Sequence, residues 1–216
     1  MNVYFLSGLG VDERAFKKIH LPESFQIRHI HWIKPLDKEN VTEYSKRLIS
    51  QIDQTTPFIL VGLSFGGIVA IEISNLIDVK KTILISSVSS AKQLPWYFKI
   101  AAFLKLNKIL PLGLLQKSGR LFYWTFGAST KEQKELLKEI NEKPDLQFTN
   151  WAVNEVINWT RKPNKLKVIQ IHGTQDIIFL IHFVNADYRI KNGGHLMIFS
   201  DADLISEKLA DILGSP

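Results

Sequence analysis

The stretch FILVGLSFGGIVAIEIS, residues 58–74, constrains the fold of this chain most strongly. Its first six residues, Phe58–Leu63, are apolar apart from one glycine and do not alternate with polar residues. Such a run is typical of a strand covered on both faces, as in a parallel sheet between two layers of helices. A helical pattern begins directly afterwards at Phe65. The chain is therefore predicted to pass straight from a buried strand into a helix, with Ser64 at the junction.

The rest of the chain repeats this alternation of short apolar runs and helical patterns. The predicted strands are Val3–Ser7, Gln26–His31, Phe58–Leu63, Lys81–Ser86, Lys167–His172 and Ala186–Ile190. The predicted helices are Val41–Gln54, Phe65–Leu76 and Asp203–Leu213, the first preceded by Asn40 and Glu43 at capping-box spacing. This order predicts an α/β fold, a mostly parallel sheet of about six strands with helices on both faces.

One segment, residues 91–159, contains no convincing strand and is rich in leucine and aromatic residues. We expect it to form an inserted helical cap, with residues 1–90 and 160–216 forming the core. Ser129 and Glu132 have capping-box spacing, and one helical face is expected to carry Phe148, Ala152, Val156 and Trp159. Two alternatives remain for the segment: ordinary core helices, or a membrane-surface helix that carries Lys99, Lys105 and Lys108 among apolar side chains.

Residues 62–66, Gly-Leu-Ser-Phe-Gly, form a G-x-S-x-G motif at the predicted strand-to-helix junction. A sharp turn there would hold Ser64 in a strained backbone conformation and bring both glycines close to other backbone, where side chains would clash. The N-terminus of the following helix would place partial positive charge beside the serine. Ser64 is therefore the candidate nucleophile.

With this motif in this context, the chain resembles the α/β-hydrolase family over almost its whole length. The resemblance implies the fold predicted above and a catalytic triad in the chain order serine, acid, histidine. His195, in NGGHLMIF between the last predicted strand and the last helix, matches the general base. His182 is a weaker rival, and His172 ends a strand and is expected to be structural.

Asp176, shortly after the strand KVIQIHG, matches the position of the triad acid. Asp187, Asp201 and Asp203 are the other candidates. The resemblance also implies an oxyanion hole made by the backbone N–H groups of Phe65 and Leu9. The loop that carries Leu9 departs from the family pattern, because Ser7 stands where a histidine often precedes the loop glycine.

These residues predict a serine hydrolase that cleaves an ester or thioester with an apolar acyl or aryl group. Trp96, Phe122 and Trp124 of the cap are predicted to line the substrate pocket, and no metal ion or organic cofactor is implied. A lyase or synthase of the menaquinone-pathway type is one alternative. It should bring several arginines to the pocket, whereas the predicted cap and the residues that directly follow it have few, namely Arg120 and Arg161. A ligand-binding protein without turnover is the other alternative.

The net charge of +6 raises the question of a nucleic-acid or anionic-surface partner. The lysines are spread out, however, and alternate with glutamates in stretches such as KEQKELLKEINEK, so solvated helix faces and a small-molecule partner are expected. The absence of cysteine excludes disulfides and a cysteine nucleophile. The first residues, MNVYFLSGLG, indicate a strand and not a signal peptide, and a cytoplasmic protein without stable membrane insertion is expected.

Overall fold

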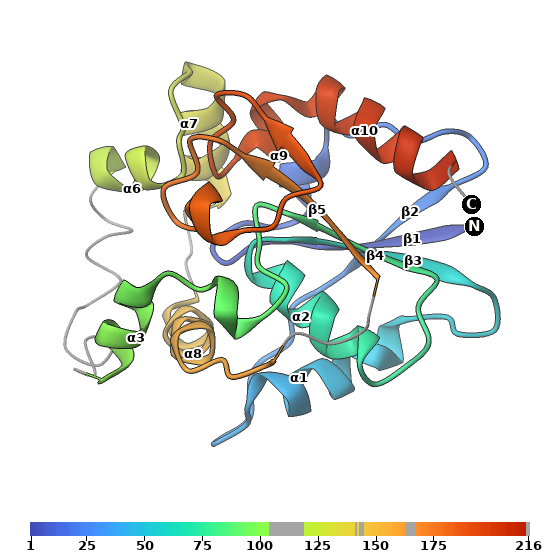
Figure 1. Cartoon of the computed structure of the whole chain (residues 1–216), viewed down its shortest axis with the longest axis horizontal. Coiled ribbons are helices and arrows are strands. Elements are labelled where there is room, and N and C mark those ends of the chain that lie inside the picture. The colour runs from blue at the N-terminus through green and yellow to red at the C-terminus, as the bar shows by residue number, and fades with distance from the viewer. Residues whose placement is uncertain (104–118, 141, 143–144, 163–166, 215–216) are drawn as a thin grey trace.

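The computed structural model describes residues 1–103, 119–140, 142, 145–162 and 167–214. Its centre is a sheet of six strands in the order β2-β1-β3-β4-β5-β6, and every neighbouring pair is parallel (Figure 1). The strands are β1 (Asn2–Leu6), β2 (Gln26–Ile30), β3 (Phe58–Leu63), β4 (Lys81–Ile85), β5 (Val168–Gly173) and β6 (Tyr188–Ile190). The predicted fold class is confirmed, and each predicted strand overlaps an observed one.

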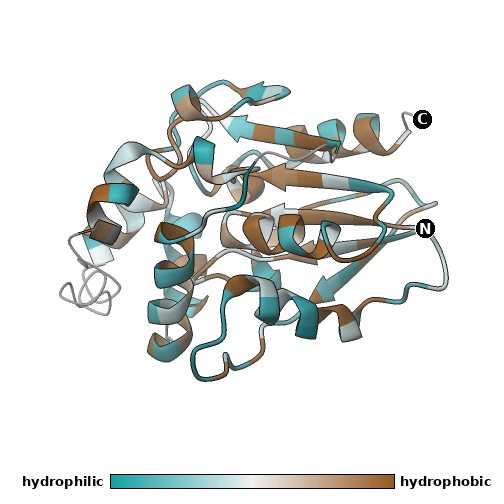
Figure 2. Ribbon diagram, turned by 60° about the horizontal axis from the view of Figure 1, so that its bottom comes forward, coloured by the Kyte–Doolittle hydropathy of each residue, from teal (hydrophilic) through white to brown (hydrophobic). Residues whose placement is uncertain are grey.

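Helices cover both faces of this sheet. On one face lie α1 (Val41–Leu48), α2 (Phe65–Ser74) and α8 (Leu146–Ile157); on the other lie α7 (Lys131–Ile140), α9 (Met197–Ser200) and α10 (Ala202–Gly214). Side chains of β3 alternate between the two cores, with Phe58 and Leu60 in the first and Ile59 and Val61 in the second. The strands are accordingly brown along much of their length in Figure 2, whereas the outer helices carry both colours.

Helix α1 begins as the sequence predicts. The side chain of Asn40 accepts the Glu43 N–H and the side chain of Glu43 accepts the Asn40 N–H, both at 3.0 Å, which completes a capping box. The helix ends at Leu48 and continues as a 3₁₀ turn to Gln51, so the predicted end at Gln54 is too late.

Between β4 and β5 the described residues form a 3₁₀ turn (Ala91–Gln93) and the helices α3 (Trp96–Phe103), α6 (Gly119–Thr125), α7 and α8. The predicted capping box of Ser129 and Glu132 is wrong by one residue. The hydroxyl of Thr130 accepts the Gln133 N–H, while the Gln133 side chain accepts the N–H groups of Ser129 and Thr130. Glu132 instead forms a 2.8 Å ion pair with Lys18.

The predicted apolar face of α8 is confirmed, since Phe148, Ala152 and Val156 are buried against α1 and α2, with Trp159 just beyond the helix. Helix α7 buries Leu136 and Leu137 in the opposite core. These two helices therefore belong to the layers beside the sheet, and a cap with its own boundaries at 91 and 159 stays a prediction. Lys105 and Lys108 lie outside the described residues. Within the described part of the chain, no helix has the length and apolar character needed to cross a membrane.

Candidate active site

Ser64 stands between the last residue of β3 and the first residue of α2, with φ 51° and ψ −119°. A non-glycine residue rarely adopts a positive φ, so surrounding contacts must hold this backbone in place. The Ser64 N–H donates to the Ile85 carbonyl at 3.0 Å. The Ser64 carbonyl accepts the Gly67 N–H at 2.9 Å and the Ser87 hydroxyl at 2.6 Å. The sharp turn expected at this serine is therefore present and is hydrogen-bonded on both sides.

The two glycines of the motif lie against backbone from neighbouring elements. A Cβ atom on Gly62 would overlap the backbone of Gly66 and Gly67, and one on Gly66 would overlap the backbone of Leu6 and Ser7. Only glycine lets the first turn of α2 approach β1 and β3 this closely. This is the close backbone approach that the sequence motif implies.

The structure brings together the three side chains that the sequence singled out. The Ser64 hydroxyl lies 2.9 Å from Nε2 of His195, and Nδ1 of His195 lies 2.8 Å from Oδ2 of Asp176. Asp176 follows β5, and His195 follows β6 and precedes α9. All three positions come after the carboxyl ends of parallel strands, which meet at one edge of the sheet.

Asp176 is almost completely buried, at 2% exposure, and both of its carboxylate oxygens have donors. Oδ1 accepts the N–H groups of Ile178 at 2.9 Å and Phe179 at 3.0 Å, and Oδ2 faces His195. Burial by itself raises the pKa of Asp176, but the charge and hydrogen bond of His195 outweigh it, so the pKa lies below its usual value of 3.8. An ionised Asp176 accepts the Nδ1 hydrogen of His195 and leaves Nε2 free to accept the Ser64 hydroxyl hydrogen.

The other candidate acids are engaged elsewhere. The Asp187 carboxylate accepts the Gln170 N–H at 2.8 Å, the Asp201 carboxylate accepts the Ser200 hydroxyl at 2.7 Å, and Asp203 is exposed in the first turn of α10. His182 is exposed in a 3₁₀ turn (Ile181–Phe183). Asp176 is thus the candidate acid that the structure hydrogen-bonds to His195.

The two residues expected to form an oxyanion hole both lie beside Ser64. Phe65 is the first residue of α2, and the first N–H groups of a helix have no acceptor within the helix. Leu9 belongs to the loop after β1, and a Cβ atom on the preceding Gly8 would come within 3.3 Å of the Ser64 Cβ. Leu9, Ser64 and Phe65 line one cavity. Their role in binding an oxyanion stays a prediction.

This cavity has a volume of about 320 Å³, and Ser64 and His195 are among the residues that line it. No charged side chain is among its described lining residues, which are Leu9, Gly10, Ser64, Phe65, Phe98, Phe122, Thr125, Phe126, Thr149, Val153, Val156, Ile178, Phe179 and His195. Phe122 lies in the wall as the sequence predicts. Contact between Phe122 and a substrate stays a prediction.

Trp96 and Trp124 are not among the described lining residues of this cavity and are 62% and 65% exposed, although Trp124 lines a second pocket together with Asp176 and His195. Their contact with a substrate stays a prediction. The helical period accounts for both positions. Trp124 is two residues after Phe122, about half a turn of α6, whereas Thr125 and Phe126 follow Phe122 by three and four residues and share its face. Trp96 likewise precedes the lining residue Phe98 by two. Spacings of four and three residues also relate Thr149, Val153 and Val156 on α8. The helical period could therefore have indicated these lining residues in advance. No sequence signal indicated Ile178 and Phe179, which lie in a loop.

A six-stranded parallel sheet, helices on both faces and a serine on a sharp turn between β3 and α2 define the α/β-hydrolase fold. Solved structures with this fold resemble the chain at low sequence identity. MenH from S. aureus superposes with a TM-score of 0.72 at 17% identity, covering 99% of this chain and 93% of that one. A thermophilic esterase from Thermogutta terrifontis gives 0.69 at 14% identity, covering 99% and 89%. The thioesterase RedJ of the prodiginine pathway of Streptomyces coelicolor gives 0.69 at 12% identity, covering 97% and 84%.

No protein-family model and no curated protein matches the sequence. At identities of this size the similarity establishes the fold alone. The chemistry of the site must therefore be argued from its own geometry.

Proposed function

We propose that the protein is a serine hydrolase that cleaves a carboxylic ester or thioester with an apolar acyl or aryl group. The observation that carries this proposal is the hydrogen-bonded chain of Ser64, His195 and Asp176, of which Ser64 and His195 line a cavity without charged side chains among its described lining residues. Esterases and thioesterases are among the structures that share the fold, which supports the same chemistry.

The mechanism follows from the positions of these side chains. His195 removes the hydroxyl proton of Ser64 as the oxygen attacks the substrate carbonyl, and Asp176 stabilises the imidazolium that forms. The N–H groups of Phe65 and Leu9 hold the oxyanion of the tetrahedral intermediate. His195 then protonates the leaving group, and a water molecule activated by the same histidine hydrolyses the acyl-enzyme.

The lyase alternative has one specific observation in its favour, the similarity to MenH. Its substrates would carry several carboxylates and would require cationic side chains at the site. The described lining of the cavity offers none, since Arg120 is exposed on α6 and Arg161 pairs with Glu72. The uncharged lining favours hydrolysis of an apolar ester or thioester. Turnover would in turn exclude the third alternative, a protein that only binds its ligand.

Labelling with a fluorophosphonate tests the proposal, because the reagent reacts with an activated serine and needs no knowledge of the substrate. Wild type and Ser200→Ala, which changes an exposed serine, should label, and Ser64→Ala should not while its circular dichroism stays unchanged. A Ser64→Ala protein that labels as strongly as wild type would exclude Ser64 as the nucleophile. Wild type should then be assayed with a panel of esters and thioesters.

The same assay tests the acid. Asp176→Asn should lower kcat by on the order of 10⁴ with little change in KM, because an amide stabilises the wrong tautomer of His195. Asp201→Asn is the matched control and should keep its kcat. A near-normal kcat in Asp176→Asn would transfer the role to Asp187, Asp201 or Asp203.

A further inference from the structure

The proposed triad leaves one buried imidazole without a role, that of His172. This residue is in β5, four positions before Asp176, and its side chain is fully buried. A buried polar ring lowers stability unless its nitrogen atoms find partners. The contacts of those two atoms show what the ring does.

The hydrogen bonds of His172 identify its tautomer. Nε2 lies 2.6 Å from the backbone carbonyl of Phe179, and a carbonyl only accepts, so Nε2 carries the hydrogen. Nδ1 is buried and has no hydrogen-bond partner among the described residues, so nothing there stabilises a second hydrogen. Burial also lowers the pKa of His172. The ring is therefore neutral, with its one N–H at Nε2.

The same Nε2 faces the candidate acid. It lies 3.4 Å from Oδ2 of Asp176, the oxygen that accepts the Nδ1 hydrogen of His195. Among the described residues, Asp176 and His195 are the titratable groups whose charge acts on the His172 ring. One carboxylate oxygen thus lies close to a ring nitrogen of each of two imidazoles.

Phe179 connects this pair to the cavity. Its N–H donates to Oδ1 of Asp176 and its carbonyl accepts from His172, so both of its backbone groups are bound. Its side chain lines the cavity, and its ring centroid lies 5.9 Å from that of His195. The turn from Asp176 to Phe179 therefore fixes the position of the candidate acid and of part of the cavity wall at the same time.

We infer that His172 is a positioning residue for the triad, an inference that rests on the proposed serine hydrolase. Its Nε2–H holds the Phe179 carbonyl and flanks the Asp176 carboxylate, which keeps Oδ2 directed at Nδ1 of His195. Because the donor is neutral, it orients the carboxylate without cancelling the negative charge that stabilises the His195 imidazolium.

Three variants test the inference. His172→Gln places an amide N–H near the position of Nε2, His172→Leu removes the donor, and His182→Leu is the matched control on an exposed histidine. His172→Leu should lower kcat by about 10- to 100-fold with KM little changed, the effect of a misplaced catalytic group. The acid limb of its kcat/KM profile should move to higher pH, because the positive end of the His172 N–H dipole no longer lies beside Oδ2 of Asp176. His172→Gln and His182→Leu should resemble wild type.

A purely structural histidine would give a different result. A folded His172→Leu protein with wild-type kcat and an unmoved pH profile overturns the inference. If His172→Leu does not fold, the kcat values of His172→Asn and His172→Gln are compared instead. The two side chains carry the same amide, but that of asparagine is one methylene shorter. Equal kcat values in that pair also overturn it.

Nitrogen-15 NMR of the wild-type imidazoles gives a readout that needs no activity. His172 should show a protonated Nε2 and a bare Nδ1 at neutral pH. An Nδ1–H tautomer or a charged ring at neutral pH overturns the inference. Failure of wild type to label with the fluorophosphonate would instead remove the proposed function, so the two failures are distinguishable.

Discussion

The cavity beside Ser64 has two walls that are attached to the molecule in different ways. Helix α8 supplies Thr149, Val153 and Val156, while α3 and the α6 region supply Phe98, Phe122, Thr125 and Phe126. Both walls come from the segment between β4 and β5, and α8 packs against α2 in the layer of helices that covers one face of the sheet. In Figure 1, α8 lies between α3 and α2, and α3 and α6 stand at the edge of the molecule.

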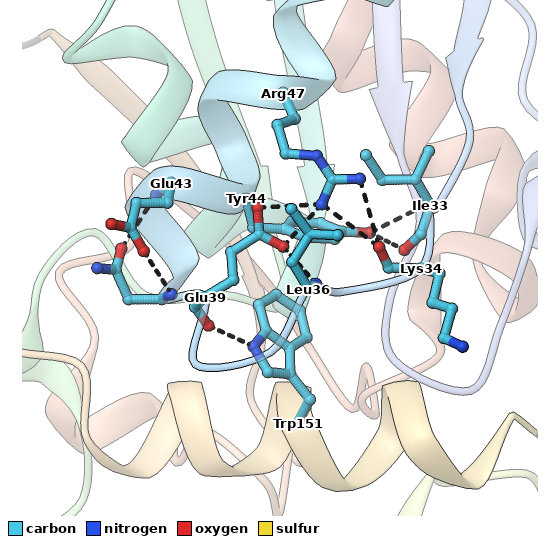
Figure 3. Close-up of polar contacts among 9 residues, drawn as sticks. Ile33, Lys34, Leu36, Glu39, Glu43, Tyr44, Arg47 and Trp151 are labelled. Atoms are coloured by element: carbon cyan, nitrogen blue, oxygen red, sulfur yellow. Dashed lines mark hydrogen bonds and ion pairs between the residues drawn. The ribbon is translucent and has the colours of Figure 1, made fainter.

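Polar contacts join α8 to the start of α1. The indole N–H of Trp151 donates to the Glu39 carbonyl at 2.7 Å, and the Glu155 carboxylate accepts the Val41 N–H at 2.9 Å. Figure 3 shows the first of these bonds between the helix and the loop before α1. The Glu39 side chain is itself held by Arg47 at 2.7 Å. The α8 wall is therefore tied to structure that a ligand does not touch.

A buried carboxylate ties the end of the same wall to the core. Glu72 of α2 is 1% exposed and accepts hydrogen bonds from Trp159 at 2.8 Å, from Thr42 at 2.7 Å and from the guanidinium of Arg161. Trp159 and Arg161 directly follow α8. Three separate segments of the chain thus meet at one carboxylate.

The α3 and α6 wall carries large apolar side chains on its outer side, among them the exposed Trp96, Phe103 and Trp124. Among the described residues, hydrogen bonds join it to the core from the Tyr97 hydroxyl to the Ile178 carbonyl at 3.3 Å and from the Leu196 N–H to the Phe126 carbonyl at 3.1 Å. The difference between the walls leads to a division of roles. Substitutions that loosen α8 should cost stability, and substitutions on the α3 and α6 wall should change which acyl chains fit.

Glu72→Ala should have the largest effect. It leaves Trp159 and Arg161 without their acceptor and should lower the free energy of unfolding by about 3–5 kcal/mol, the usual cost of breaking a buried ion pair. Urea denaturation measures the change. Glu135→Ala, which removes an exposed partner of Lys131, is the matched control and should change stability by less than about 0.5 kcal/mol. Equal losses would mean that the α8 wall does not depend on this carboxylate.

The same carboxylate should make stability depend on pH. Burial raises the pKa of Glu72, but hydrogen bonds from Arg161, Trp159 and Thr42 outweigh it, so the folded-state pKa lies below 4.5. The unfolded chain then binds the proton more readily than the folded one. The contribution is complete above the unfolded pKa of about 4.3 and is lost as the pH falls through the folded-state value. Acid titration of stability should be steeper for wild type than for Glu72→Gln; parallel curves would contradict this.

A smaller effect is expected when one tryptophan of each wall is replaced by phenylalanine. Trp151→Phe leaves the Glu39 carbonyl without its donor and should lower the free energy of unfolding by about 1–3 kcal/mol. Trp124→Phe, on the exposed side of α6, should change it by less than about 0.5 kcal/mol. Thermal or urea unfolding of the two variants under one set of conditions compares them directly. A larger loss for Trp124→Phe would reverse the comparison.

The smallest expected effect is the change in activation free energy for each methylene group added to the substrate's acyl chain. Burial of a methylene is worth about 0.8 kcal/mol, so each one that fits should raise kcat/KM about fourfold until the chain reaches the wall. In a p-nitrophenyl ester series, Phe98→Ala and Phe122→Leu should move that limit to longer chains. Trp124→Ala should leave it in place, because this side chain faces away from the cavity. A flat wild-type profile would mean that the substrate is recognised by polar contacts.

Much of this architecture could be predicted because its causes are local. An uninterrupted apolar run such as Phe58–Leu63 must be covered on both faces, and the glycines around Ser64 permit only a tight turn. Asn40 and Glu43 are three residues apart and can cap a helix without help from elsewhere. The roles of Asp176 and His195 were expected only through a resemblance in chain order. His195 is 19 positions from Asp176 and 131 positions from Ser64, and no local sequence pattern predicts contacts between residues so far apart.

The sequence alone therefore determined the strands, the turn at Ser64 and the class of fold, since each depends on neighbouring residues. The tertiary structure decided which aromatic side chains face the cavity, because Phe122 and Trp124 are chemically similar and differ only in which side of α6 meets the core. It also decided that Glu132 pairs with the distant Lys18, and that His172 lies against Asp176. These outcomes depend on contacts between distant segments, whose geometry exists only once the sheet and its helices are packed together.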